Sequence, residues 1–281
     1  MEAATPPIAP LDTRPWAALT EADFGAAAAV PTMLSPGERR FYLWLAQYWA
    51  TGAGAIVDLG CYVGGSTAYL AEGLRRAGRT QQIHAYDRFR TSESLKEAFL
   101  YPAGIAPFDG DEIGAVTENL LTPWQPGITL HCGEISEAVW NGEPIELLAI
   151  DAAKTAADAD AMARIFFPHL IPGRSVVVHQ DYLHWKAPWI PLQMEGMAEC
   201  FAPLAFCPRD TVAFLCTRAV DGAALAAGRT CQRRDREVQA ALAAAATRLA
   251  PLGLGERLDK TAEGLRRNPN KRRAKDFTIR P

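Results

Sequence analysis

The chain has 281 residues, of which 49% are hydrophobic and 22% are charged, and its formal net charge is −3. These values are ordinary for a soluble globular protein, and the length suits one large domain with decorations better than two full domains. The charge gives no global attraction to nucleic acid, and no run approaches the ~20 apolar residues of a membrane span. We expect neither partner, and without a signal-peptide pattern at the N-terminus we expect a cytoplasmic protein.

Residues 1–35 are rich in Ala and Pro, and we expect them to form an N-terminal arm that wraps the domain or stays loose. A helix is predicted to start at Ser35-Pro36-Gly37-Glu38. Ser35 can cap it, Pro36 suits the first helical position, and Glu38 can complete a capping box.

Apolar strand-like runs then alternate with helix-like segments. Predicted strands are 55–59, 82–87, 128–132, 145–151, 175–180, 204–207 and 212–217, and predicted helices are 64–77, 92–122 with a break near 102–107, 156–167 and 188–201. Five strands with helical crossovers indicate a doubly wound, mostly parallel α/β sheet. A short turn at 208–211 predicts that the last two strands form a hairpin.

The main domain is predicted to cover residues 36–218, and residues 219–281 to form a helical extension. Within the extension, 220–250 is expected to be one Ala-rich helix. Residues 265–281 carry seven Lys or Arg against one Asp, which favours a solvated basic tail. Docking of this tail on a partner subunit or an acidic ligand is the alternative. An arm and an added helix also leave a homodimer open.

The central motif is Asp58-Leu59-Gly60-Cys61-Tyr62-Val63-Gly64-Gly65-Ser66, which follows a strand and opens a helix. Glycines here let backbone N–H groups approach a ligand closely at the carboxyl edge of the sheet. A dinucleotide site needs glycine where Tyr62 stands, so this corner disfavours pyrophosphate. An acid at Asp58 suits a cationic, phosphate-free ligand instead.

This stretch resembles motif I of class I S-adenosylmethionine-dependent methyltransferases, and its Gly64-Gly65-Ser66 ending is similar to the macrocin and catechol O-methyltransferase-like branches. The resemblance covers roughly residues 36–218. It implies a Rossmann-like, seven-stranded, mostly parallel sheet with an antiparallel final strand. It also implies O-methylation (EC 2.1.1.-) of a small-molecule hydroxyl, on a sugar or secondary metabolite, as part of biosynthesis.

The resemblance implies a set of cofactor contacts. Asp87 ends the second strand, where a carboxylate accepts the ribose hydroxyls, and Glu134 ends the third, where the family contacts adenine. The residues expected at the S-adenosylmethionine site are Asp58, Gly60, Tyr62, Gly64, Ser66, Asp87, Arg88, Glu134 and Asp151.

Asp151-Ala152-Ala153-Lys154 resembles the acid-x-x-Lys of catechol-type enzymes, in which the acid binds a divalent metal and the lysine deprotonates the acceptor. The metal set implied here is Asp151, Gln180 and Asp181, with Mg²⁺ as the ion. Gln180 supplies no charge, so this set is weaker than three carboxylates, and metal dependence stays open.

The predicted catalytic residues are Lys154, His179, Asp181 and His184. Lys154 is expected to act as general base if burial lowers its pKa, and the histidines are the alternative bases. Two other functions remain open: an oxidoreductase or hydroxylase-like enzyme on the same sheet, and a non-catalytic assembly subunit that keeps the cofactor fold.

Overall fold

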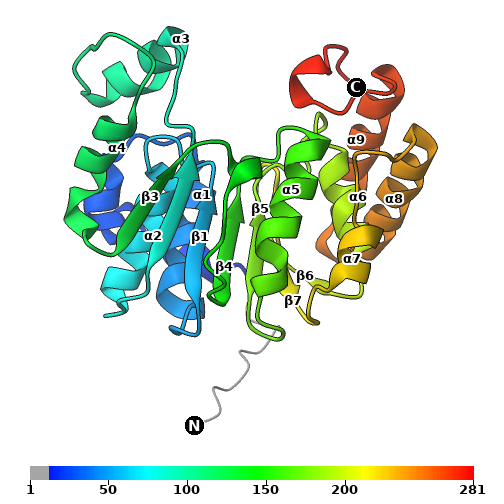
Figure 1. Cartoon of the computed structure of the whole chain (residues 1–281), viewed down its shortest axis with the longest axis horizontal. Coiled ribbons are helices and arrows are strands. Elements are labelled where there is room, and N and C mark those ends of the chain that lie inside the picture. The colour runs from blue at the N-terminus through cyan, green and yellow to red at the C-terminus, as the bar shows by residue number, and fades with distance from the viewer. Residues whose placement is uncertain (1–12) are drawn as a thin grey trace.

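The computed structural model describes residues 13–281, so residues 1–12 of the predicted arm lie outside the described part. Its core is one seven-stranded sheet in the order β3-β2-β1-β4-β5-β7-β6 (Figure 1). The strands are β1 (Ala55–Leu59), β2 (Ile83–Asp87), β3 (Ile128–Cys132), β4 (Ile145–Ile150), β5 (Val176–His179), β6 (Phe201–Cys207) and β7 (Thr211–Cys216).

The pairing of the strands confirms the predicted fold class. β1 pairs in parallel with β2 and β4. β3 pairs in parallel with β2, and β5 pairs in parallel with β4. The last strand, β7, is antiparallel to both β5 and β6, with which it forms the predicted hairpin. The strand order reverses between β1 and β4, because β2 and β3 lie on one side of β1 and the later strands lie on the other. Open α/β sheets bind ligands at this point.

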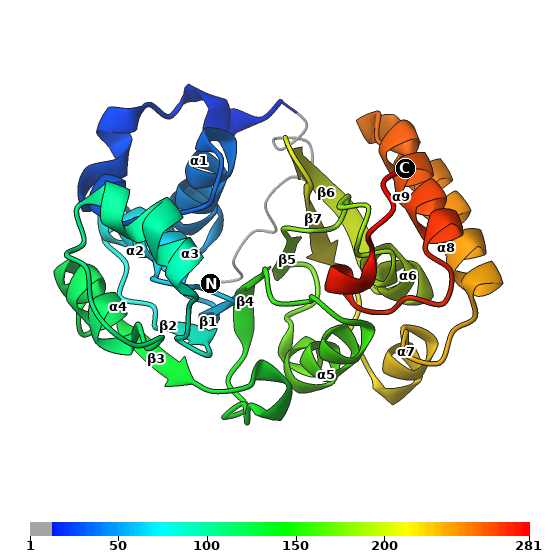
Figure 2. The same ribbon diagram turned by 90° about the horizontal axis from the view of Figure 1, so that it is seen from above.

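Helices cover both faces of the sheet, and β6–β7 lie beyond β5 (Figure 2). The helices are α1 (Pro36–Trp44), α2 (Gly65–Arg76), α3 (Glu93–Leu95), α4 (Gly114–Leu121), α5 (Ala156–Phe166), α6 (Trp189–Gly196), α7 (Gly222–Ala227), α8 (Asp235–Arg248) and α9 (Gly255–Arg267). The capping box predicted at the start of α1 is present: Glu38 N donates to Ser35 Oγ, and Ser35 N donates to Glu38 Oε2.

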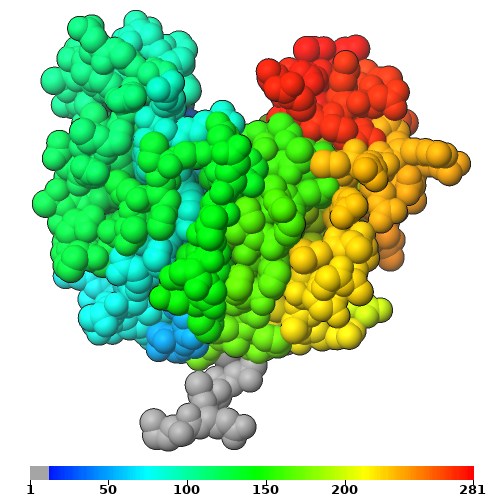
Figure 3. All heavy atoms as spheres, viewed as in Figure 1, coloured from blue at the N-terminus to red at the C-terminus, as the bar shows by residue number. Residues whose placement is uncertain are grey.

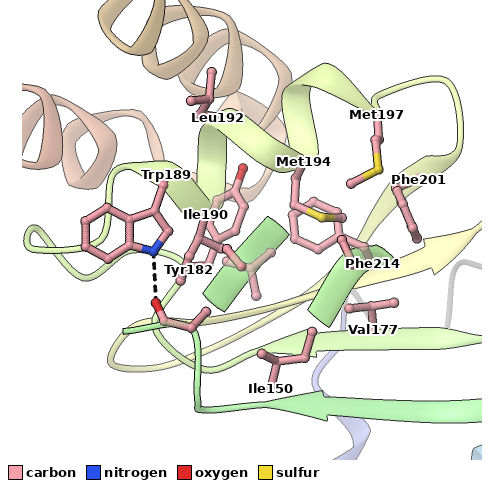
Figure 4. Packing of buried hydrophobic residues seen from close by; sticks show 14 of the residues in the cluster. Ile150, Val177, Tyr182, Trp189, Ile190, Leu192, Met194, Met197, Phe201 and Phe214 are labelled. Carbon is pink, nitrogen blue, oxygen red and sulfur yellow. Dashed lines mark hydrogen bonds between the residues drawn. The ribbon is translucent and has the colours of Figure 1, made fainter. Parts of the chain in front are cut away.

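Successive side chains of a strand point to opposite faces of the sheet, so alternate strand residues belong to two separate apolar layers. Val57 and Val177 pack toward α5, α6 and α8, whereas Ile56 and Val178 pack toward α1 and α2. Figure 4 shows the first layer, in which Trp189 donates its indole N–H to the Ala153 carbonyl at 2.8 Å. Tyr182, Met194 and Met197 belong to this layer and are buried core residues.

Three predicted elements differ from the structure. The single helix at 220–250 is wrong, because the chain breaks between α7 and α8. The Thr230 amide and hydroxyl both donate there to Asp160 of α5, at 2.8 Å. The helical stretch predicted at 92–122 is reduced to short α3, a π-helical turn and α4, with 104–113 in loops and turns.

The basic tail has exposed basic side chains, as predicted, apart from the half-buried Arg272, but its backbone is folded against the domain. Residues up to 267 belong to α9, and the chain then folds back so that Phe277 is fully buried against Trp185 and Trp189. The arm was predicted either to wrap the domain or to stay loose. Its described part wraps the domain, because Trp16 and Phe24 are buried. No helix in residues 13–281 combines the length and apolar character that crossing a membrane requires.

Candidate active site

The site begins at the turn between β1 and α2. Gly60, Tyr62 and Gly64 all have positive φ, at 93°, 53° and 86°. A Cβ on Gly60 would stand 3.1 Å from the Asp151 carbonyl carbon, so only glycine lets β1 pass this close to the end of β4. The turn therefore brings the start of α2 and the end of β4 to one place.

Asp58 lies beneath this turn. It is 2% exposed, and its Oδ2 accepts hydrogen bonds from Ser66 Oγ and Thr67 Oγ1, both at 2.7 Å. Burial raises the pKa of Asp58 to about 6, and the two hydroxyl donors only partly offset that effect. Asp58 was expected to face the ligand, but the structure places it as the anchor of the first turn of α2.

Asp87 ends β2 beside the turn. Its Oδ2 accepts the Tyr62 N–H and its Oδ1 accepts the Phe89 N–H, both at 2.9 Å. Each carboxylate oxygen keeps a further lone pair, so Asp87 can still accept two ligand hydroxyls. Next to it, Arg88 and Glu134 form an exposed ion pair at 2.9 Å that joins the ends of β2 and β3.

These residues line a cleft of about 590 Å³ at the carboxyl ends of the strands, a size typical of small-molecule sites. Figure 3 shows a hollow between two lobes, one formed by the segment between β2 and β3 and the other by the C-terminal residues. Seven of the predicted site residues line this cleft: Gly60, Tyr62, Asp87, Arg88, Glu134, Asp151 and Lys154.

A smaller recess of about 30 Å³ adjoins the cleft at Gly60, Tyr62 and Asp151. The predicted residues Ser66 and Gln180 line it. The Gln180 side chain accepts a hydrogen bond from the Tyr42 hydroxyl of α1 at 3.3 Å. Gly64 does not line either space, because it packs on Leu121 instead.

Lys154 joins two carboxylates at the end of the sheet. Its Nζ lies 2.6 Å from Asp151 Oδ1 and 2.5 Å from Asp181 Oδ2. Burial raises the pKa of Asp151 to about 6, although the nearby ammonium opposes this rise. Burial disfavours the charged form of Lys154, but the two carboxylates outweigh it and raise the pKa of the lysine. Lys154 therefore carries a positive charge, contrary to the expectation of a lowered pKa.

This cluster also bears on the predicted metal site at Asp151, Gln180 and Asp181. The Lys154 ammonium occupies the position between the two carboxylates that a shared cation would take. Within the described part of the chain, no group of three or more His, Cys, Asp or Glu side chains is arranged to hold a metal ion. The metal prediction is therefore not supported, and the lysine supplies one positive charge between the two acids.

The two predicted histidines lie away from the cleft. His179 is 1% exposed, neither of its ring nitrogens has a partner among residues 13–281, and its ring faces Phe167. Burial lowers the pKa of His179 to about 3, which favours a neutral core side chain. His184 stacks on Trp185 in the loop after β5, and its Nδ1 accepts the Lys186 N–H at 3.3 Å. Neither histidine lines the cleft.

Two chain segments that sequence reasoning left out complete the walls. Arm residues 31–34 line the recess, and Met33 lines both spaces. From the other end of the chain, Arg273 and Lys275 line the cleft. For the C-terminal segment, the sequence offers one sign that it packs on the domain. Phe277 is a lone aromatic residue in a basic stretch, and the structure buries it.

A family model described as "Methyltransferase domain" matches residues 57–182, from within β1 to just beyond β5. Residues 57–182 therefore carry a class I methyltransferase domain. The resemblance predicted from motif I is thereby confirmed, and the matched range contains every predicted site residue except His184. The matched range excludes the arm and the C-terminal extension, the two segments that add walls to the site.

Solved structures similar to the methyltransferase domain share little sequence with it, and no curated protein matches the chain. The O-methyltransferase NovP is 12% identical, over 66% of this chain and 82% of its own, with a TM-score of 0.49. The SAH-bound Podospora anserina methyltransferase PaMTH1 is 13% identical, over 92% and 79%, with a TM-score of 0.38. The SAH-containing structure of cmcI is 16% identical, over 65% and 77%, with a TM-score of 0.39. The fold assignment depends on the strand order and not on these likenesses.

Proposed function

We propose that this chain transfers the methyl group of S-adenosylmethionine to a hydroxyl oxygen of a small-molecule acceptor. One observation carries the proposal: the glycine turn, Asp87, Asp151 and Lys154 line a single cleft at the point where the strand order reverses, and Asp181 contacts Lys154 from outside that lining. The turn and Asp87 suit a nucleoside, and the charged cluster suits proton transfer from an acceptor. The family match to residues 57–182 supports this assignment.

The residues present fit S-adenosylmethionine better than a dinucleotide. Gly60 leaves backbone open at the cleft, and the spare lone pairs of Asp87 suit ribose hydroxyls. Tyr62 stands where a pyrophosphate needs glycine. Asp151 lines both spaces and places a carboxylate where a sulfonium or ammonium group would be stabilised. When bound, S-adenosylmethionine supplies the electrophilic methyl group.

The raised pKa of Lys154 changes the role that we assign to it. A protonated lysine cannot accept a proton, but its ammonium can donate a hydrogen bond to the acceptor oxygen and stabilise negative charge there. The carboxylate of Asp151, which contacts Lys154 and lines the cleft, is then placed to receive the hydroxyl proton. His179 is buried and His184 does not line the cleft, so neither has a part in this scheme.

Two substitutions at Lys154 test this scheme in a methyl-transfer assay with labelled S-adenosylmethionine and a panel of hydroxylated small molecules. Lys154→Met removes the charge, and we expect kcat to fall about 100-fold or more, as for loss of a hydrogen-bond donor that stabilises developing negative charge. Lys154→Arg keeps a cation between the acids, and we expect it to retain activity within about tenfold of the wild type. Asp111→Asn, outside the cleft, is the matched control for a lost surface charge.

The outcomes separate the proposal from its rivals. Equal loss in both Lys154 variants would show that the free amine acts as base, because arginine cannot replace it. A folded protein that binds the cofactor product but is unaffected by Lys154→Met in every assay would be a non-catalytic subunit. Turnover that needs a nicotinamide cofactor would place the chain among the oxidoreductases.

A further inference from the structure

The C-terminal segment, residues 268–281, is held firmly against the domain. Asn268 is 4% exposed, and its side chain forms hydrogen bonds both with the end of α9 and with residues 278–279, where the chain has folded back. Its Nδ2 donates to the carbonyls of Gly264 and Ile279 at 2.8 and 2.7 Å, and its Oδ1 accepts the Thr278 N–H at 3.0 Å. Together with the buried Phe277, these bonds fix the direction of the chain.

The fixed segment runs beside the end of β4, where the charged cluster lies. The Ala156 N–H donates to the Arg272 carbonyl, and the Ala274 N–H donates to the Lys154 carbonyl, both at 2.9 Å. Thr155 and Arg273 face each other in an antiparallel bridge. The backbone of Lys154 is thus bonded to the segment that carries Arg273 and Lys275 into the cleft.

The cations around the cleft fall into two groups. Arg88 is paired with Glu134, and Lys154 is paired with Asp151 and Asp181. In the described chain, by contrast, the side chains of Arg273 and Lys275 have no ion pair and no hydrogen bond, although both line the cleft.

Their neighbour Arg272 is different, because it pairs with Asp235 on the outer side at 2.7 Å. Two acids that line the cleft, Asp87 and Asp158, lack an ion pair with any described residue. Asp87 accepts two backbone N–H groups at the glycine turn, whereas Asp158 follows Thr155, which bridges to Arg273, and is therefore the acid that competes for the two free cations. Two positive charges against this one leave an excess of positive charge at the C-terminal wall.

We propose that Arg273 and Lys275 bind an anionic group of the methyl acceptor, a carboxylate or a phosphate. This inference rests on the proposed function and adds the substrate class. An arginine fork can bind either group through two parallel hydrogen bonds, and a lysine adds a point charge. An acceptor held by its anion at this wall would extend toward Lys154, whose backbone is bonded to the same segment.

The test is a ligand-observed NMR titration of the protein saturated with S-adenosylhomocysteine. The probes are 3,4-dihydroxybenzoate, its neutral amide 3,4-dihydroxybenzamide, and inorganic phosphate. We expect the benzoate to bind about tenfold more tightly than the amide, since the two differ only in the charged group. Binding by the benzoate but not by phosphate would identify a carboxylate acceptor, and the reverse would identify a phosphate.

The variant that removes the two free cations is Arg273→Gln with Lys275→Gln, and the matched control is Lys271→Gln with Arg280→Gln. The control side chains belong to the same segment but do not line the cleft. The first pair should reduce the preference for the anion to about twofold or less, while the control keeps it. Melting temperatures near that of the wild type show that the segment stays folded.

Three results would overturn the inference: equal binding of benzoate and benzamide, an anion preference that persists without Arg273 and Lys275, or no binding of either anion at millimolar concentration. Failure of the proposed function gives a different result, because S-adenosylhomocysteine itself would then not bind the folded protein.

Discussion

At the scale of single residues, the acids of this site serve different purposes. Asp58 is buried and bonded to two hydroxyls, Asp87 holds the turn while facing the cleft, and Asp151 is paired with a lysine. The positions of all three near the carboxyl ends of strands follow from the sequence, because each comes late in, or directly after, an apolar run. The different roles of the three acids depend on which side chains surround them in the folded structure.

The burial of Asp58 predicts an effect on stability. The folded protein keeps this carboxyl protonated up to about pH 6, whereas in the unfolded chain its pKa is the ordinary aspartate value of 3.8. The unfolding free energy should therefore decrease as pH rises from about 4 to about 6, by roughly 2 to 3 kcal/mol, and stay lower above that range. Asp58→Asn keeps an oxygen acceptor for Ser66 and Thr67 and removes the ionisation.

We expect the variant to be more stable than the wild type at pH 7 by on the order of 2 kcal/mol, and equally stable near pH 4. Urea denaturation of both proteins across this pH range gives the difference directly. A variant that is less stable at neutral pH would show that Asp58 is ionised and stabilised by its two hydroxyl donors.

Residue types alone did not reveal the state of Lys154 or His179. The acid-x-x-Lys spacing correctly placed Lys154 in the cleft, but Asp181 comes from another strand end, and its contact with Lys154 is what keeps the lysine charged. His179 occupies an alternating position of β5, and the layer it faces is decided by helices far away in the sequence. Such contacts between distant segments have no local signature.

At the scale of elements, strands were predicted more successfully than the C-terminal helices. Each central strand is a short apolar run between turns, so its length and type are local properties. The break between α7 and α8 instead depends on Asp160 of α5, which accepts the hydrogen bonds of Thr230. The fold-back after α9 likewise depends on a site for Phe277 between Trp185 and Trp189.

Phe277 is expected to anchor the fold-back as one unit. Phe277→Ala removes a fully buried ring, a change that costs about 3 kcal/mol in a core. Because this side chain lies near the end of the chain, we expect local release of residues 268–281 and not global unfolding.

Hydrogen exchange measures this release at the Ala274 amide, which bonds to the Lys154 carbonyl. Its protection should fall about 100-fold in Phe277→Ala, while amides of β4 keep theirs. Ile279→Ala, at a side chain that is 55% exposed, is the control. Unchanged protection of Ala274 in Phe277→Ala would mean that other bonds hold the segment.

At the scale of the whole molecule, both flanks of the matched domain return to one edge of the sheet. Arm residues 31–34 reach the start of α2, where a Cβ on Gly65 would stand 2.5 Å from Thr32. The C-terminal segment reaches the end of β4 from the opposite side. The division into 1–35, 36–218 and 219–281 remains a prediction, but the site takes walls from all three ranges.

This convergence could not be predicted from the chain alone. The motif at 58–66 and the acids at strand ends located the cleft, because the carboxyl ends of parallel strands share one edge. The arm and tail were placed outside the domain because their composition lacks a clear period. Their positions follow from a few buried anchors, Trp16, Phe24 and Phe277.

A calorimetric titration of the purified protein with S-adenosylhomocysteine and with NAD⁺ tests the central claim most directly. We predict micromolar binding of the first, no binding of the second, and a loss of about tenfold, ~1.4 kcal/mol, in Asp87→Asn, with Asp111→Asn unchanged. A correctly folded protein that does not bind S-adenosylhomocysteine, or that binds NAD⁺ in its place, would contradict the account.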